Sequence, residues 1–75
     1  MDRRKEARYS AQMLVMNLGK EEMVEYGYYR FFTGINENLD KATRIASLKT
    51  ALAEYENQNY HEIAEAIYEL IKVTR

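Results

Sequence analysis

Apolar residues recur at helical spacing along most of the chain, and no segment alternates apolar and polar residues as a strand would. The spacing predicts helices over residues 2–18, 20–33, 40–56 and 60–74. Gly19 and Gly34 are expected to end the first two helices, which are either separate or one helix bent at Gly19. Residues 34–39 form a loop in which Asn36 or Asn38 is expected to cap the third helix. The pattern predicts one all-α domain, a small bundle of three to four helices.

The last two segments predict an antiparallel αα-hairpin. The fourth segment has one continuous apolar face, made by Tyr60, Ile63, Ala64, Ile67, Leu70 and Ile71. The third repeats apolar residues as a two-heptad seam of Ile45, Leu48, Leu52 and Tyr55. Between them lies a short polar turn, where Asn59 is expected to be the N-cap and Glu62 to complete a capping box. We expect Ile67 and Leu70 to be buried.

Residues 48–71 also resemble a tetratricopeptide-type helix pair. Tyr55, Ala64 and Tyr68 stand at the spacings of that repeat's Tyr, Ala and aromatic positions. Leu52 and Tyr60 depart from the repeat, and its closing proline is missing. About three such repeats are needed to bury their own faces, so the resemblance implies a helical hairpin and nothing more.

The first segment is apolar on two opposite sides. One stripe consists of Ala7, Ala11, Leu14 and Leu18, and the other of Tyr9, Met13 and Met16. A surface helix of a small domain normally has a single apolar face. Two interpretations are open. Either the helix is central and wrapped by the others, or one stripe packs inside while the other meets a partner or a second copy.

The second segment concentrates aromatic residues between positions 26 and 32. Val24, Tyr28 and Phe31 share one side and are expected to lie in the core, whereas Tyr26 and Tyr29 are expected to be partly exposed. The tyrosines either pack at the boundary of a domain too small to hide them or form a contact surface, since Tyr and Met are enriched at the centres of interfaces. The candidate partner-binding residues are Tyr9, Met13, Met16, Tyr26 and Tyr29.

The composition argues against most kinds of catalytic, metal-binding and phosphate-binding site. The chain has no cysteine and one histidine, His61, so a metal site would have only the pair of His61 and Glu65, one helical turn apart. A nucleophile–base pair would need Ser10 or Ser47 beside His61, and both serines lie in other predicted helices. The three glycines of the chain are isolated and form no phosphate-binding loop. We therefore expect no enzymatic activity, no metal and no cofactor.

Charge gives one local signal. The formal net charge of −1 provides no global attraction to nucleic acid or to a membrane. The longest apolar run has four residues, far short of the roughly 20 of a membrane-spanning helix, so a cytoplasmic protein is expected. A basic cluster opens the first helix, where the helix dipole disfavours cations. This cluster, Arg3, Arg4, Lys5 and Arg8, is either a solvated helix end or a contact for phosphates or an acidic surface.

The sequence thus predicts a small non-enzymatic protein–protein interaction module, an adaptor, inhibitor or regulator that acts through its aromatic and methionine-rich surface. The surplus apolar stripe predicts a homodimer, with a second protein as a further partner. The alternative is a nucleic-acid-binding regulator that uses the basic first helix, although the long loop before the third helix does not fit a helix-turn-helix motif. Short helical proteins without cysteine are frequent among bacterial and phage accessory proteins, and we expect a source of that kind.

Overall fold

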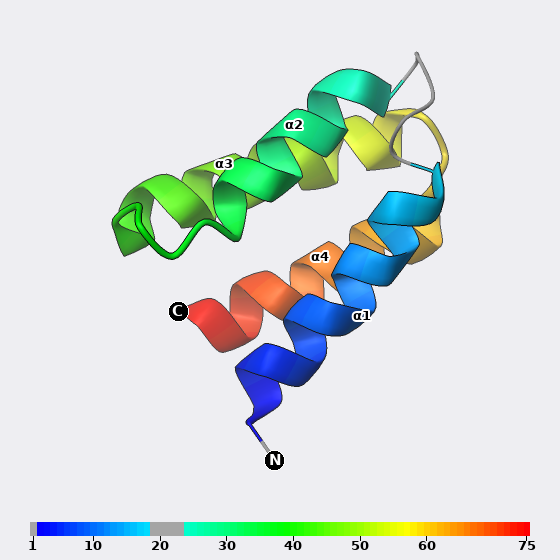
Figure 1. Cartoon of the computed structure of the whole chain (residues 1–75). Coiled ribbons are helices and arrows are strands. Elements are labelled where there is room, and N and C mark those ends of the chain that lie inside the picture. Colours follow the sequence, from blue (N-terminus) through cyan, green and yellow to red (C-terminus); the bar gives the residue numbers. More distant parts are fainter. Residues whose placement is uncertain (1, 19–23) are drawn as a thin grey trace.

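The protein folds into four helices connected in sequence order. The computed structural model describes residues 2–18 and 24–75. Within them lie α1 (Arg3–Leu18), α2 (Glu25–Gly34), α3 (Lys41–Asn57) and α4 (His61–Thr74), with no strand among the described residues. Successive helices run in opposite directions (Figure 1), so α1 and α2 are two helices rather than one bent helix. The all-α prediction is confirmed, while the predicted stop at Gly19 and the start of the second helix at 20–23 fall outside the described residues.

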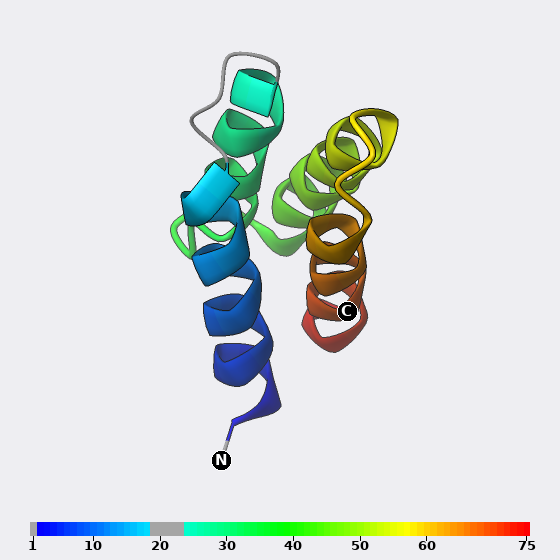
Figure 2. The same cartoon turned by 90° about the vertical axis from the view of Figure 1, so that its right-hand side faces the viewer.

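The four helices are arranged as two pairs. α2 packs on α3, and α1 packs on α4. The predicted α3–α4 hairpin joins the two pairs, whereas α1 and α2 have few contacts with each other. The pairs meet near the α3–α4 turn and diverge toward the α2–α3 turn (Figure 1). Seen from the side, α1 and α2 lie on one side of the molecule, and α3 and α4 on the other (Figure 2).

The core lies where the four helices meet. Ile67 and Leu70 are buried, as predicted from the apolar face of α4. On α3 the predicted heptad seam is only half right, since Ile45 and Leu52 are half-buried. α3 has α2 on one side and α4 on the other, so its buried surface is wider than the seam of a helix with one partner. The buried residues of α3 are Ser47, Leu48, Ala51 and Tyr55.

Two glycines set the distance between α2 and α3. A Cβ atom at Gly27 would lie 3.1 Å from Cε2 of Tyr55, so the missing side chain lets α2 approach α3 closely. A Cβ atom at Gly34 would lie only 2.5 Å from Cδ2 of Leu48. Gly34 ends α2 as predicted, but its missing side chain serves packing as well as termination.

Both predicted helix caps are wrong. α3 is capped by Asp40, whose carboxylate accepts hydrogen bonds from the Thr43 backbone N–H at 3.2 Å and the Thr43 hydroxyl at 2.6 Å. These hydrogen bonds hold the pKa of Asp40 below its usual value of 3.8. Asn36 instead accepts from the Asn38 backbone N–H within the loop. Asn59 adopts a left-handed φ of 67° just after α3, so Tyr60 is the N-cap residue of α4, and it makes no side-chain capping bond.

Candidate functional site

α1 exposes large apolar side chains on the side turned away from the bundle. Ala11 and Val15 are fully buried, and the helical repeat places the stripe of Tyr9, Met13 and Met16 on the opposite side. These three side chains are 66%, 45% and 51% exposed. We name them the outer face of α1. Their exposure excludes a wrapped central helix and leaves the interpretation in which one stripe packs inside and the other stays available.

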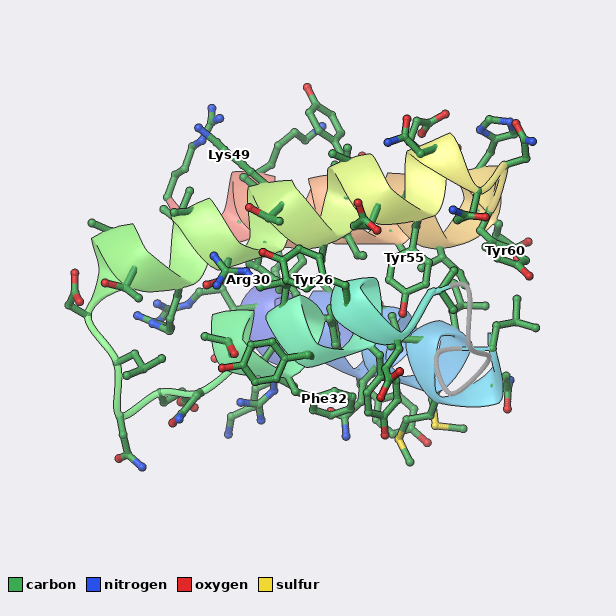
Figure 3. The ribbon with its side chains drawn as sticks, turned by 90° about the horizontal axis from the view of Figure 1, so that it is seen from above. Tyr26, Arg30, Phe32, Lys49, Tyr55 and Tyr60 are labelled. Carbon is green, nitrogen blue, oxygen red and sulfur yellow. The ribbon has the colours of Figure 1, made fainter. Side chains whose placement is uncertain are left out.

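The exposed aromatic residues of α2 form a second patch. Val24 and Phe31 are fully buried, and Tyr26 and Tyr29 are 55% and 63% exposed, as expected. Tyr28, which was expected in the core, is half-buried and packs against it. The guanidinium of Arg30 lies 6.0 Å from the centroid of the Tyr26 ring. Figure 3 shows Tyr26 and Arg30 on the side of α2 nearer to α3 and Phe32 on the opposite side.

The five candidate partner-binding residues are divided between two helices, with three on α1 and two on α2. The outer face of α1 joins three of these residues in one helical row, whereas Tyr26 and Tyr29 are the two residues on α2. The row on α1 is therefore the more continuous candidate surface.

An acidic groove borders the outer face of α1. Three glutamates of α4 line this shallow groove together with Met13 of the outer face. Among them, Glu69 is paired with Lys72 of its own helix, at 3.3 Å between Oε1 and Nζ. The full lining is Ser10, Met13, Leu14, Glu62, Glu65, Ala66 and Glu69. The outer face is thus flanked by negative charge on the side of α4.

A basic cleft opens where the two helix pairs diverge. Its volume is about 300 Å³, and its walls come from the start of α1, the end of α4, the α2–α3 turn and α3. Four cations and two carboxylates lie around apolar side chains. The lining residues are Asp2, Arg4, Lys5, Arg8, Gly34, Ile35, Glu37, Arg44, Leu48, Leu70 and Thr74. Three of the four predicted basic residues therefore lie together in the cleft, and Arg3 is not part of its lining.

The polar groups of the cleft differ in how they are partnered. Nη1 of Arg8 lies 3.1 Å from Oε1 of Glu37, an exposed ion pair that links α1 to the α2–α3 turn. Oδ1 of Asp2 accepts a hydrogen bond from the Arg4 backbone N–H at 2.9 Å. Arg44 takes part in no ion pair among the described residues, and its buried Nε makes no hydrogen bond. Its charge is therefore not compensated by a direct partner and favours an anion in the cleft.

The sequence showed Arg44, with Lys41 and Lys49, as a cation of the third helix that adds to the basic cluster, but it did not place Arg44 beside that cluster, and it gave no role to Glu37. Arg44 and Glu37 lie about thirty residues or more from the basic start of α1, and only the fold brings them beside it. A periodicity along one helix cannot reveal a neighbour on another helix, so the sequence could not show that Arg44 and Glu37 lie beside the start of α1. Lys49, another cation of α3, points away from α2 (Figure 3).

The single histidine lies outside both surfaces. Nδ1 of His61 is 2.5 Å from Oε1 of Glu56, across the α3–α4 turn, rather than paired with Glu65 one helical turn away. Among the described residues, no group of three or more His, Cys, Asp or Glu side chains could hold a metal ion. In the same part of the chain, no helix combines the length and the apolar character needed to cross a membrane.

One buried polar group belongs to the core. The hydroxyl of Tyr55 is buried without a hydrogen-bond partner, and the ring of Tyr60 lies at a centroid distance of 6.4 Å. Burial, together with the neighbouring Tyr28, raises the pKa of Tyr55 to about 12. Figure 3 shows its side chain pointing from α3 toward the α2 side of the molecule.

Comparisons with known proteins give no family for this chain. No protein-family model matches the sequence, and no curated protein or solved structure is significantly similar to it.

Proposed function

We propose that this protein is a small non-enzymatic interaction module that pairs with a second copy through the outer face of α1. The observation that carries the proposal is the exposure of Tyr9, Met13 and Met16 opposite the buried stripe of the same helix. Tyr and Met are enriched at interface centres, and small domains commonly gain stability by oligomerising. A dimer of this kind suits an adaptor, an inhibitor or a regulator.

The charges around the outer face favour a second copy in antiparallel orientation. The first half of α1 is basic, and its last turn carries no basic residue to offset the negative end of the helix dipole. Arg3 is the one basic residue of this cluster outside the lining of the cleft, and in an antiparallel pair it lies beside the C-terminal half of the other α1. That half also runs along the acidic groove that holds Glu62 and Glu65. Such a pair buries apolar surface in the middle and matches opposite charges at both ends.

The test is the mass in solution of matched variants. Met13→Glu places a charge in the middle of the outer face and is expected to weaken dimerisation by about 30-fold, the effect of losing a central anchor of about 2 kcal/mol. Tyr68→Ala is the control, because Tyr68 is an exposed aromatic residue on α4, outside the outer face. Sedimentation equilibrium gives both dissociation constants. A wild-type chain that stays at 8.9 kDa up to several hundred micromolar contradicts the proposal.

Tyr26 and Tyr29 lie outside the outer face of α1 and are proposed as a contact for another protein. Because both are exposed, Tyr26→Ala and Tyr29→Ala should leave the circular dichroism spectrum and the melting temperature unchanged. An unfolded double variant would show that these tyrosines hold the core together.

Nucleic-acid binding by the first helix has less support. Arg4, Lys5 and Arg8 share their cleft with Asp2 and Glu37, which reduces the positive potential that a duplex would meet. We expect little binding of duplex DNA at physiological salt. A salt-sensitive complex in a gel-shift assay that disappears when Arg3, Arg4 and Arg8 become Gln would reverse this preference.

A further inference from the structure

The basic cleft is built from parts that the outer face does not use. Arg4, Lys5 and Arg8 come from the first turns of α1, while Arg44 comes from α3 and faces them across the cleft. Ile35, Leu48 and Leu70 line the same space with apolar side chains. A site with several cations around an apolar lining suits a ligand that joins an anionic group to an apolar body.

The charge of the lining indicates which anion fits. Four cations stand against two carboxylates, so the lining has an excess of two positive charges. A phosphate monoester carries about −1.5 to −2 charges at neutral pH and offers three acceptor oxygens. Arginine is the side chain best shaped to bind such a group with two parallel hydrogen bonds.

The partners already present leave room for those acceptor oxygens. Asp2 accepts from a backbone N–H at the start of α1, and Glu37 engages Arg8 at 3.1 Å. Arg44 takes part in no ion pair among the described residues. An incoming phosphate can therefore pair with Arg44 and compete with Glu37 for Arg8.

The size of the cleft limits the body that carries the phosphate. Small-molecule sites span about 300 to 1,000 Å³, and this cleft of about 300 Å³ lies at the lower end of that range. We infer that the cleft between α1, α3 and the α2–α3 turn binds a phosphate monoester attached to a single compact apolar group, such as one aromatic ring. The site is separate from the outer face of α1 and does not rest on dimerisation.

The test is a titration of the ¹⁵N-labelled protein with phenyl phosphate at physiological salt, followed by NMR. Saturable shifts are expected at the backbone amides of Ile35, Leu48 and Thr74, which line the cleft. Inorganic phosphate lacks the apolar group and should bind at least tenfold more weakly, since burying an aromatic ring contributes more than about 1.4 kcal/mol. Equal affinity for both probes, or no saturable shift with phenyl phosphate, overturns the inference.

Substitutions locate the site. Arg44→Gln is expected to weaken phenyl phosphate binding by about tenfold, because it removes a charge-assisted hydrogen bond. Lys49→Gln on the same helix is its control, since Lys49 is exposed and outside the cleft. Arg4→Gln and Arg3→Gln form the same kind of pair on α1. Control variants that lose as much affinity as their partners would mean general attraction to positive charge and would overturn the site.

Glu37→Gln is expected to strengthen the binding of phenyl phosphate, a result that misfolding of the variant would not produce. It removes a carboxylate from the cleft and frees Arg8, so affinity should rise by about fivefold, the effect of one unit charge at about 4 Å in water. Unchanged or weaker binding in this variant overturns the inference.

Two further measurements complete the test. A phosphotyrosine peptide flanked by glycines tests whether the phosphate belongs to a phosphorylated side chain or to a free small molecule. Tighter binding of the peptide than of phenyl phosphate indicates a phosphorylated side chain, and weaker binding indicates a free small molecule. Met13→Glu should bind phenyl phosphate as the wild type does, so the cleft and the dimer can fail independently. A loss of binding in Met13→Glu contradicts a separate site.

Discussion

The packing within the α2–α3 pair differs from the packing within the α1–α4 pair. α2 approaches α3 through glycines, so that side chains of α3 occupy the space that a Cβ atom at Gly27 or Gly34 would need. α1 packs on α4 with a stripe that includes Ala11 and Val15, against the continuous apolar face of α4. The acidic groove lies on the α1–α4 pair alone, whereas the basic cleft lies between the two pairs and is lined by residues of both. The α2–α3 pair is therefore the one sensitive to added atoms, and the α1–α4 pair the one sensitive to removed atoms.

The largest expected effect comes from removing side chains of α4. Ile67→Ala and Leu70→Ala each delete buried atoms and leave a cavity, so each should lower the free energy of unfolding by about 2–5 kcal/mol. Urea denaturation followed by circular dichroism measures the change. Tyr68→Ala, an exposed neighbour, should lie close to the wild type. Wild-type midpoints for both core variants would mean that the buried face of α4 is assigned wrongly.

The α2–α3 pair should break by the opposite change, the addition of a methyl group. In Gly34→Ala the new Cβ would meet Leu48 at 2.5 Å, and Leu48 is itself buried, so we expect a loss of about 1–3 kcal/mol.

Gly27→Ala sharpens the comparison. Its nearest contacts are 3.1 Å to the Tyr55 ring and 3.2 Å to Cβ of Glu54, and the helix propensity of Ala offsets up to about 1 kcal/mol of strain. This variant should therefore stay near the stability of the wild type. Thermal melts of the two variants measure the difference in stability. A larger loss of stability in Gly27→Ala than in Gly34→Ala would contradict the contact distances at the two glycines.

Tyr55 tests the same pair through its buried hydroxyl. Tyr55→Phe removes a polar group that lacks a partner and should raise the free energy of unfolding by about 1 kcal/mol at neutral pH.

The variant should also change the response to alkali. The pKa of Tyr55 is about 12 in the folded protein and near 10.0 when unfolded, so the neutral form is favoured by folding. The stability that Tyr55 contributes is complete below pH 10.0 and is lost as the pH rises through 12. Tyr55→Phe should lose less stability than the wild type between these values. Parallel pH dependence of the two proteins would contradict the raised pKa.

The smallest expected effect concerns the ion pair across the cleft. Arg8 and Glu37 are both exposed, and an exposed pair contributes about 0–1 kcal/mol. Glu37→Gln should therefore lower the free energy of unfolding by less than about 1 kcal/mol. The difference between the variant and the wild type should vanish in about 1 M salt, because the Debye length there is only about 3 Å. A loss that persists at high salt would show that Glu37 holds the two helix pairs together in another way.

The periodicity of apolar residues along the chain predicted well which side of a single helix is buried and which is exposed. The opposite stripes of α1 and the division of α2 between Phe31 and Tyr29 follow from the angle between successive residues, and both are confirmed. The predictions that failed concern relations beyond one helix. The caps at Asn36, Asn38 and Asn59 depended on loop conformation, which several Asn and Asp residues satisfy equally well in sequence. The buried face of α3 and the membership of Arg44 in the cleft depended on which helices are neighbours.

The order of the helices in space has a consequence for folding. α2 packs on α3 and α3 packs on α4, in each case through a short connection that closes at little entropic cost. α1 packs mainly on α4, the helix farthest from it in sequence, so its docking closes the longest loop in the molecule. The hairpin and α2 are expected to assemble first, and α1 to join last. The basic cleft exists only after that final step, because the start of α1 forms one of its walls.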